Sequence, residues 1–152
     1  MINNKIVVYT AGTWDLFHRG HVNILRKSKE LGDILIVGVS TDKLVKKYKK
    51  IYPTFSYRDR RYIVDACKYV DKSITQEVLL DIKILKKYKV DIITIGSDWK
   101  DKKLKGLDYM RNHGKVVYLP YTSNVSTTVL KRKIIKSAFD ILKADILRNR
   151  TD

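Results

Sequence analysis

Five short runs of apolar, mostly β-branched residues recur along the chain, and segments with helical periodicity separate them. The runs cover residues 5–10, 34–40, 72–75, 90–96 and 115–120. Strands that alternate with helices pair in parallel, because each crossover helix returns the chain to the same edge of the sheet. The pattern predicts an α/β fold, a Rossmann-like, doubly wound sheet of five parallel strands with helices on both faces.

The segments between these runs carry apolar residues three and four positions apart, which indicates helices. We expect a helix after His18, a short one from residue 41 that turns into a basic loop, and further helices over residues 57–70, 76–89, within 103–114 and 126–148. At 152 residues the chain has the size of a single domain. We expect one domain over 1–152, with a core of about 1–136 and a helical extension over 137–152.

Composition excludes several classes of protein. No apolar run approaches the length of a transmembrane helix, and the first ten residues lack the pattern of a signal peptide. The single cysteine, Cys67, fits a reducing compartment, so we expect a cytoplasmic protein. The net charge of +16 is spread over most of the chain, and no zinc-finger or RNA-recognition signature accompanies it. A small polyanionic substrate fits this charge better than nucleic acid does.

Three unusual segments follow predicted strands. They are residues 11–21 after the first strand, 96–100 after the fourth and 121–128 after the fifth. Parallel sheets bind ligands beyond the carboxyl ends of their strands, where the strand order reverses. We therefore expect all three segments to lie at one edge of the sheet and to form a binding site there.

Two histidines, His18 and His21, flank Gly20 in the first of these segments. A zinc site needs further ligands, and the remaining His113 and Cys67 lie elsewhere in the chain. Residues three apart point the same way at the start of a helix, where the helix dipole favours an anion. Two imidazoles at that end can donate hydrogen bonds to phosphate, so the segment predicts phosphate chemistry.

The segment "GTWDLFHRGH" resembles the G-T-F-D-x-x-H-x-G-H signature of the nucleotidyltransferase superfamily. Other motifs agree in order: "VSTD" (39–42), "YRDRR" with "YVD" (57–71), "GSDW" (96–99) and "SNVSTT" (123–128). "GSDW" resembles the G-D-D-W of cytidylyltransferases. The whole set is most similar to the glycerol-3-phosphate cytidylyltransferases, and it covers the chain to about residue 136.

The resemblance implies a reaction in which a phosphomonoester, glycerol 3-phosphate first among them, attacks CTP and releases pyrophosphate. It implies catalytic roles for His18, His21 and Lys49, and Mg²⁺ on the triphosphate. The nucleotide-binding residues that it implies are Thr10, Ala11, Gly12, Thr13, Trp14, His18, His21, Gly96, Asp98, Trp99, Ser126, Thr127 and Thr128. The substrate-binding residues that it implies are Asp15, which is also a water-mediated Mg²⁺ ligand, Lys47, Lys68 and Tyr121.

Two departures from the family pattern affect the acceptor pocket. Tyr121 and Lys68 stand where the family carries arginines, and Asn124 stands where it carries glycine. Tyrosine offers no guanidinium fork to a phosphate, and lysine is not equivalent to arginine. Lys131 or Arg132 are candidates to supply the missing charge, and a different acceptor is the alternative.

Several alternatives stay open at this stage. An adenylyltransferase acting on a sugar phosphate or cofactor precursor shares the histidine and Ser-Thr-Thr motifs. A non-catalytic nucleotide- or nucleic-acid-binding module is the alternative from another class. Structural roles also compete: Ser126 as a helix cap, Trp99 as core, and Lys47 and Lys49 as a solvated charge run.

The resemblance further implies a homodimer with the arginine-rich helix near the interface, which makes Arg60 and Arg61 candidates. The last helix has an apolar face. We expect this face to be mainly core, with its far end available for a dimer contact.

Overall fold

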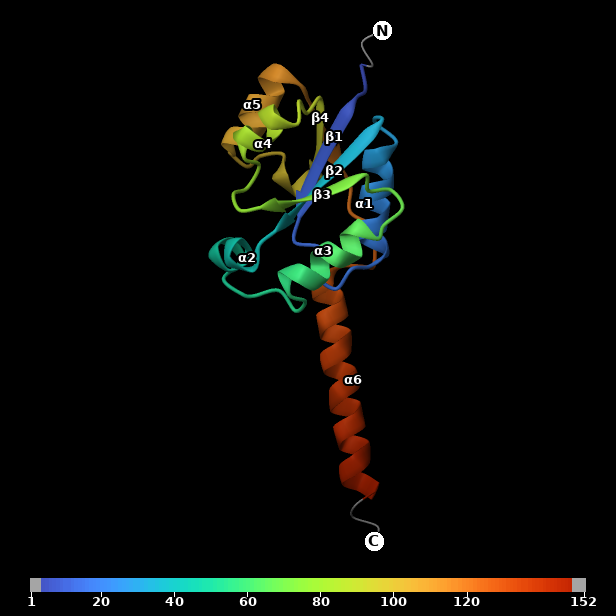
Figure 1. Cartoon of the computed structure of the whole chain (residues 1–152). Helices are drawn as coiled ribbons and strands as arrows, with labels where there is room; N and C mark the ends of the chain where they lie inside the picture. Colours follow the sequence, from blue (N-terminus) through green and yellow to red (C-terminus); the bar gives the residue numbers. More distant parts are fainter. Residues whose placement is uncertain (1–3, 149–152) are drawn as a thin grey trace.

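The computed structural model describes residues 4–148, and these form a five-stranded parallel sheet of order β3-β2-β1-β4-β5 (Figure 1). The strands are β1 (Val7–Gly12), β2 (Ile34–Ser40), β3 (Lys72–Gln76), β4 (Ile92–Gly96) and β5 (Lys115–Leu119). The order reverses between β1 and β4, which hydrogen-bond side by side. The predicted fold class is therefore confirmed, and the site is expected at this reversal.

Helices cover both faces of the sheet. They are α1 (Arg19–Lys29), α2 (Asp42–Lys49), α3 (Tyr57–Asp65), α4 (Ile82–Lys87), α5 (Lys105–His113) and α6 (Thr127–Arg148), with a short 3₁₀ turn, η1 (Ser97–Trp99). Leu25 of α1 and Val64 of α3 pack on one face, against Val8 and Leu35. On the other face α4 and α5 pack against Tyr9, Ile36 and Ile93. The two buried layers fix the sheet and leave its carboxyl edge open.

Two predicted helices differ from the structure. The helix expected over 76–89 starts only at Ile82, because Gln76 still belongs to β3, where it pairs with Ser40. Leu80 then adopts a left-handed backbone (φ 48°) and is buried among the core residues, which breaks helical periodicity. The helix expected over 57–70 ends at Asp65, and the remainder forms turns into β3.

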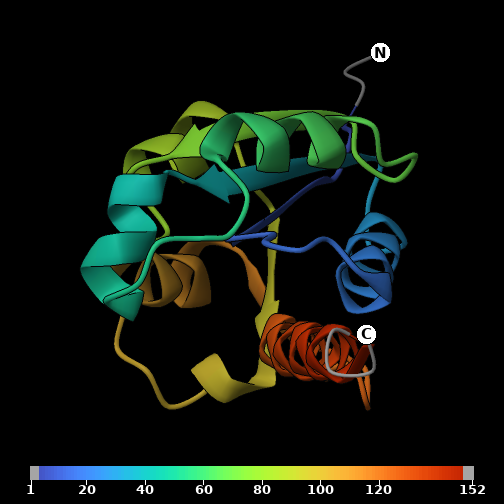
Figure 2. The same cartoon turned by 90° about the horizontal axis from the view of Figure 1, so that it is seen from below.

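The long helix α6 does not pack as core, and that prediction was wrong. It begins beside the carboxyl edge and then extends away from the rest of the chain (Figures 1 and 2). Every residue from Arg132 to Arg148 is exposed. Only the first turns of α6 thus contribute to the sheet edge. No helix within residues 4–148 has the length and apolar character needed to cross a membrane.

A buried arginine joins the loops at the carboxyl edge. Arg60 of α3 has no exposed surface, and its guanidinium donates hydrogen bonds to the carbonyls of Thr13, Ser40 (2.7 Å) and Phe55 (3.1 Å). Asp42 supplies the countercharge at 2.7 Å. One side chain therefore ties together the ends of β1 and β2 and the loop before α3. Its burial inside its own chain also rules out the predicted role at a dimer interface.

We predict that Arg60→Lys lowers the free energy of unfolding by about 3 kcal/mol, measured by urea denaturation. An ammonium cannot satisfy acceptors in four directions, so buried carbonyls would lose their partners. The neighbouring, partly exposed Arg61 provides the control, because Arg61→Lys should cost less than about 1 kcal/mol. Equal effects of the two substitutions would contradict the role assigned to Arg60.

Candidate active site

A pocket of about 750 Å³ occupies the carboxyl edge of the sheet. It is lined by the ends of β1, β2, β3 and β4, the start of α1, the end of α2, and the first turns of α6. Of the site residues predicted from the sequence, the lining includes Thr10, Ala11, Gly12, Thr13, Trp14, Asp15, His18, His21, Lys49, Gly96, Asp98, Trp99, Tyr121, Thr127 and Thr128. Three segments far apart in the sequence therefore meet, as predicted.

Three predicted residues are not part of this lining. Ser126 acts as the N-cap of α6, where its hydroxyl accepts the amide N–H of Val129 at 3.1 Å. Lys47 is on the exposed side of α2. Lys68 lies in the turns before β3, at the opposite edge of the sheet, with its ammonium over the Tyr69 ring. The substrate-binding role predicted for Lys47 and Lys68 finds no support in their positions.

The two histidines begin helix α1 by capping it. Nδ1 of His18 accepts the amide N–H of Gly20 at 3.1 Å, and Nδ1 of His21 accepts the amide N–H of His18 at 3.3 Å. This is a reciprocal capping box in which both side chains are imidazoles. Because each Nδ1 is an acceptor, each ring carries its proton on Nε2. The helix cap thus leaves two Nε2–H donors.

The side chain of His18 folds back over position 20, which leaves room there only for glycine. A Cβ at position 20 would lie 2.8 Å from Cε1 of His18 and 3.0 Å from its Nδ1. The imidazole rings of His18 and His21 stack with centroids 3.9 Å apart. The spacing of the two histidines around a glycine therefore has a local steric cause. The amides of His18 and Gly20, which the start of a helix would otherwise offer to an anion, are used within the cap.

Both imidazoles are held neutral. Burial, together with the repulsion that Lys49 and a protonated His18 would exert, lowers the pKa of His21 to about 3. Burial also lowers the pKa of His18. Neutral imidazoles remain hydrogen-bond donors through Nε2, so donation to a phosphate does not depend on a positive charge on either ring.

Asp15 is a buried structural anchor. Its carboxylate accepts the amide N–H of Thr54 and of Phe55, both at 2.9 Å, and lies 3.4 Å from the ammonium of Lys131. Burial raises the pKa of Asp15, but the two amides and Lys131 outweigh it and lower the pKa overall. Both oxygens are engaged by the chain itself, which disfavours the predicted role as a Mg²⁺ ligand.

No protein ligand set for a metal is present among residues 4–148, because no three His, Cys, Asp or Glu side chains come together. The cations of the pocket are instead Lys49, Lys102, Lys131 and Arg132. Burial lowers the pKa of Lys49, and nearby Lys131 and Arg60 add to this against the opposing charge of Asp15. The pocket is thus arranged to receive negative charge.

A second polar group lies beyond β4 and β5. The hydroxyl of Tyr121 donates to Oδ1 of Asp98 at 2.7 Å, and the ammonium of Lys102 lies 4.2 Å from the centre of the Trp99 ring. Gly96 makes room for this pair, since its Cβ would lie 2.6 Å from both Asp98 and Tyr121. Tyr121 stands where the family carries an arginine, and here its hydroxyl binds a carboxylate of the same chain.

Sequence reasoning missed several residues of the pocket. Ser40 and Gln76 end β2 and β3 and bond each other at 2.9 Å, and the Tyr48 hydroxyl lies 2.8 Å from that of Thr13. A polar residue at the end of a buried strand was the available signal for Gln76. Asn124, which stands where the family carries glycine, has a left-handed backbone with φ 62°.

Comparison with known proteins agrees with this geometry. The sequence profile of the family described as "Cytidylyltransferase-like" matches residues 9–144. Glycerol-3-phosphate cytidylyltransferase of Bacillus spizizenii is 39% identical over 127 residues, 82% of this chain and 94% of that protein. The enzyme of the same name from Staphylococcus aureus is 35% identical over 129 residues, 84% of this chain and 93% of that protein.

Solved structures show the same fold. The lipopolysaccharide core biosynthesis protein of Thermoplasma volcanium superposes with a TM-score of 0.63 at 28% identity, over 78% of this chain and 97% of that one. A putative nicotinate-nucleotide adenylyltransferase of Vibrio parahaemolyticus superposes with a TM-score of 0.61 at 18% identity, over 88% of each chain, and at that identity shows the fold alone.

We predict that acidification from pH 7 to pH 5 lowers the free energy of unfolding by about 1 to 2 kcal/mol through His21. The unfolded chain binds a proton near pH 6.5, whereas the folded chain holds His21 neutral down to about pH 3. This stability is present above pH 6.5 and is lost as the pH falls toward 3. The lowered pKa values of His18 and Asp15 act with the same sign, Asp15 only below about pH 4.

Urea denaturation at several pH values, on the wild type and on His21→Gln, measures this effect. The variant should show a smaller loss of stability between pH 7 and pH 5, whatever its absolute stability. Identical pH dependence in the two proteins would mean that His21 is protonated in the folded state.

Proposed function

The chain belongs to the cytidylyltransferase-like family of nucleotidyltransferases, and we propose that it transfers CMP from CTP to glycerol 3-phosphate. An oxygen of the acceptor phosphate attacks the α-phosphorus of CTP, and the bond from that phosphorus to the β-phosphate oxygen breaks. The products are CDP-glycerol and pyrophosphate. The observation that carries the proposal is the pair of capped, neutral imidazoles in one pocket with the start of α6.

The triphosphate would lie between α1 and α6. Nε2–H of His18 and of His21 would donate to phosphate oxygens on one side. The first amides of α6, at Thr127 and Thr128, have no acceptor within the helix and would donate on the other. The Thr127 hydroxyl already donates to the Asp15 carbonyl at 2.9 Å, which fixes the start of α6 against the loop after β1.

Charge neutralisation would come from the cations of the pocket. Lys49 approaches from the end of α2, and Lys131 and Arg132 approach from the second turn of α6. Phosphoryl transfer depends mainly on positioning and on stabilising the charge that develops on the leaving group. Mg²⁺ would enter with the nucleotide, held by phosphate oxygens and water, since the described residues provide no cage for it.

The base would lie beyond β4. There the carboxylate of Asp98, oriented by Tyr121, can accept a hydrogen bond from an exocyclic amine, and Trp99 offers a ring surface. Cytosine and adenine both carry such an amine. The names of the relatives in Bacillus and Staphylococcus support CTP, while ATP remains the alternative that the experiment tests.

The acceptor would occupy the remaining part of the pocket, beyond β2 and β3. Its lining there includes Gln76, Leu79 and Tyr52. Since Tyr121 is occupied with Asp98 and Lys68 lies at the other edge, we assign the acceptor phosphate to Lys49, Lys131 and Arg132. An acceptor whose group beyond the phosphate is neutral and hydroxylated, such as glycerol 3-phosphate, suits this lining, which carries no further carboxylate to bind a cationic head group.

We predict pyrophosphate release from CTP and glycerol 3-phosphate in the presence of Mg²⁺. The assay crosses CTP, ATP, GTP and UTP with glycerol 3-phosphate, phosphocholine, phosphoethanolamine and several sugar phosphates. Release with CTP and a different acceptor would keep the cytidylyltransferase and replace the acceptor. Release with ATP alone would establish the adenylyltransferase alternative, and CTP binding without any release would contradict the proposed transfer.

We further predict that His18→Asn and His21→Ala each reduce turnover by roughly 100-fold or more. Asparagine retains a side-chain oxygen that caps α1 but removes the Nε2–H donor, so His18→Asn separates catalysis from stability. His113, stacked on Tyr109 away from the pocket, provides the control. Turnover near that of His113→Ala in both variants would remove the proposed mechanism.

A further inference from the structure

A chain of buried polar side chains lies at the carboxyl ends of β2 and β3, and it has no task in the transfer proposed above. The Tyr9 hydroxyl donates to Oε1 of Gln76 at 3.1 Å, and Nε2 of Gln76 donates to Oγ of Ser40 at 2.9 Å. The three residues are between 0% and 2% exposed. Gln76 and Ser40 line the pocket, whereas Tyr9 belongs to the core. The chain therefore connects the core with the pocket.

The orientation of the Gln76 amide is fixed by Tyr9. Burial, with the negative charge of Asp81 nearby, raises the pKa of the Tyr9 hydroxyl, so this group stays protonated. Within residues 4–148 the hydroxyl has no acceptor other than Gln76, so it donates there and holds Oε1 toward itself. Gly38 makes room for it, since a Cβ at position 38 would collide with the hydroxyl oxygen. The amide nitrogen is thereby turned toward Ser40.

Gln76 keeps hydrogen-bonding capacity that the chain itself does not use. A primary amide has two N–H donors and two lone pairs on its oxygen, and Ser40 and Tyr9 take one of each. No group in the described part of the chain, 4–148, takes the second N–H or the second lone pair. Because buried polar groups are costly when left unpaired, this end of the pocket suits a ligand that both donates and accepts.

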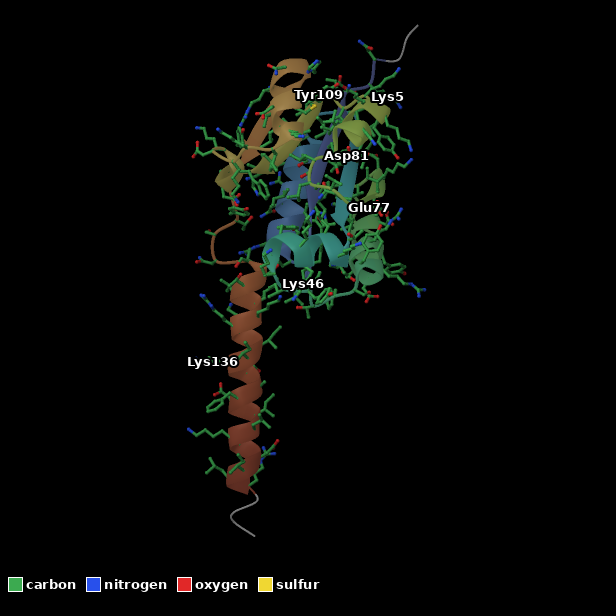
Figure 3. All side chains as sticks on the ribbon, turned by 90° about the vertical axis from the view of Figure 1, so that its left-hand side faces the viewer. Lys5, Lys46, Glu77, Asp81, Tyr109 and Lys136 are labelled. Atoms are coloured by element: carbon green, nitrogen blue, oxygen red, sulfur yellow. The ribbon has the colours of Figure 1, made fainter. Side chains whose placement is uncertain are left out.

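The amide lies beside apolar side chains. Leu79 and Leu80, in the segment between β3 and α4, also line the pocket, and Leu80 packs in the same core cluster as Tyr9. Glu77 and Asp81, labelled in Figure 3, mark the two ends of that segment, and neither carboxylate lines the pocket. Apolar surroundings strengthen a hydrogen bond made to the amide and raise the cost of leaving it unmade.

We propose that Gln76 selects the acceptor by hydrogen bonds to a hydroxyl group beyond the acceptor's phosphate. The inference rests on the proposed function, which puts the acceptor beyond β2 and β3. A hydroxyl group donates and accepts at once, so it satisfies the spare lone pair and the spare N–H together. An ammonium group satisfies the lone pair alone, and a trimethylammonium group satisfies neither. The substrate class that this amide selects is therefore the phosphomonoester of a polyol.

Removal of the hydroxyl groups from the acceptor, combined with Gln76→Met, tests this contact. The acceptors are glycerol 3-phosphate and propyl phosphate, which has the same carbon chain without hydroxyls, and the assay is pyrophosphate release with CTP and Mg²⁺. The wild type should prefer glycerol 3-phosphate in kcat/KM by roughly 10- to 100-fold, because propyl phosphate leaves buried polar groups unpaired. Gln76→Met should reduce this preference by about 10-fold or more and change the KM for CTP by less than about twofold.

Thr75→Val is the matched control. Thr75 precedes Gln76 in β3, and its hydroxyl lies 2.7 Å from that of Tyr57, where neither residue lines the pocket. This variant should keep the preference of the wild type. Equal losses with both acceptors in Gln76→Met would assign the amide a purely structural role and overturn the proposal, and so would an unchanged preference.

The wild type also tests the proposal without any variant, since equal kcat/KM for glycerol 3-phosphate and propyl phosphate would overturn it. In each of these cases, release with CTP and glycerol 3-phosphate by the wild type leaves the proposed function in place. Absence of release with every acceptor would instead overturn the proposed function, and this inference with it.

Discussion

The carboxyl edge of this sheet depends on two reciprocal anchors, Arg60 and Asp15. The guanidinium of Arg60 binds backbone carbonyls that follow β1, end β2 and precede α3. The carboxylate of Asp15 binds the amides of Thr54 and Phe55 in the same loop before α3. Phe55 thus gives its carbonyl to one anchor and its amide to the other. Three loops that would otherwise move independently are held as one unit.

The position of the histidines follows from this arrangement. The loop after β1 contains Asp15, and its Thr13 carbonyl binds Arg60. This loop continues directly into the capping box of α1, so the two imidazoles are held in place by the same contacts. The hydrogen bonds that start the helix also fix the tautomer of both rings. The hydrogen bonds that start α1 therefore also leave the Nε2–H groups of His18 and His21 as donors. Burial keeps the rings neutral, which adds donors to the site without adding charge.

Much of the fold could be predicted from the sequence, because strands buried on both faces must be continuous apolar runs. The meeting of residues 11–21, 96–100 and 121–128 followed from parallel topology alone. The conformation of the residues between Gln76 and α4 could not be predicted. Leu80 is buried there although its backbone is left-handed, and its spacing from neighbouring apolar residues is the same as in a helix. The burial of Arg60 could not be predicted either, because three of its four partners are backbone carbonyls, which a sequence does not distinguish.

Helix α6 illustrates a further limit. Its bounds were nearly correct, but periodicity shows only that a face is apolar and not what covers it. The first turns of α6 hold Lys131 against Asp15 and present Thr127 at the pocket, while the rest extends into solvent. One helix thus serves the site at one end and offers an unpaired apolar face at the other.

A crystal structure of the protein with CTP tests the central claim most directly. The account predicts the triphosphate between Nε2 of His18 and His21 and the first amides of α6, with the loops held by Arg60 and Asp15 unmoved. A triphosphate bound along the exposed lysines of α2, or imidazoles turned so that Nδ1 faces the phosphates, would contradict it.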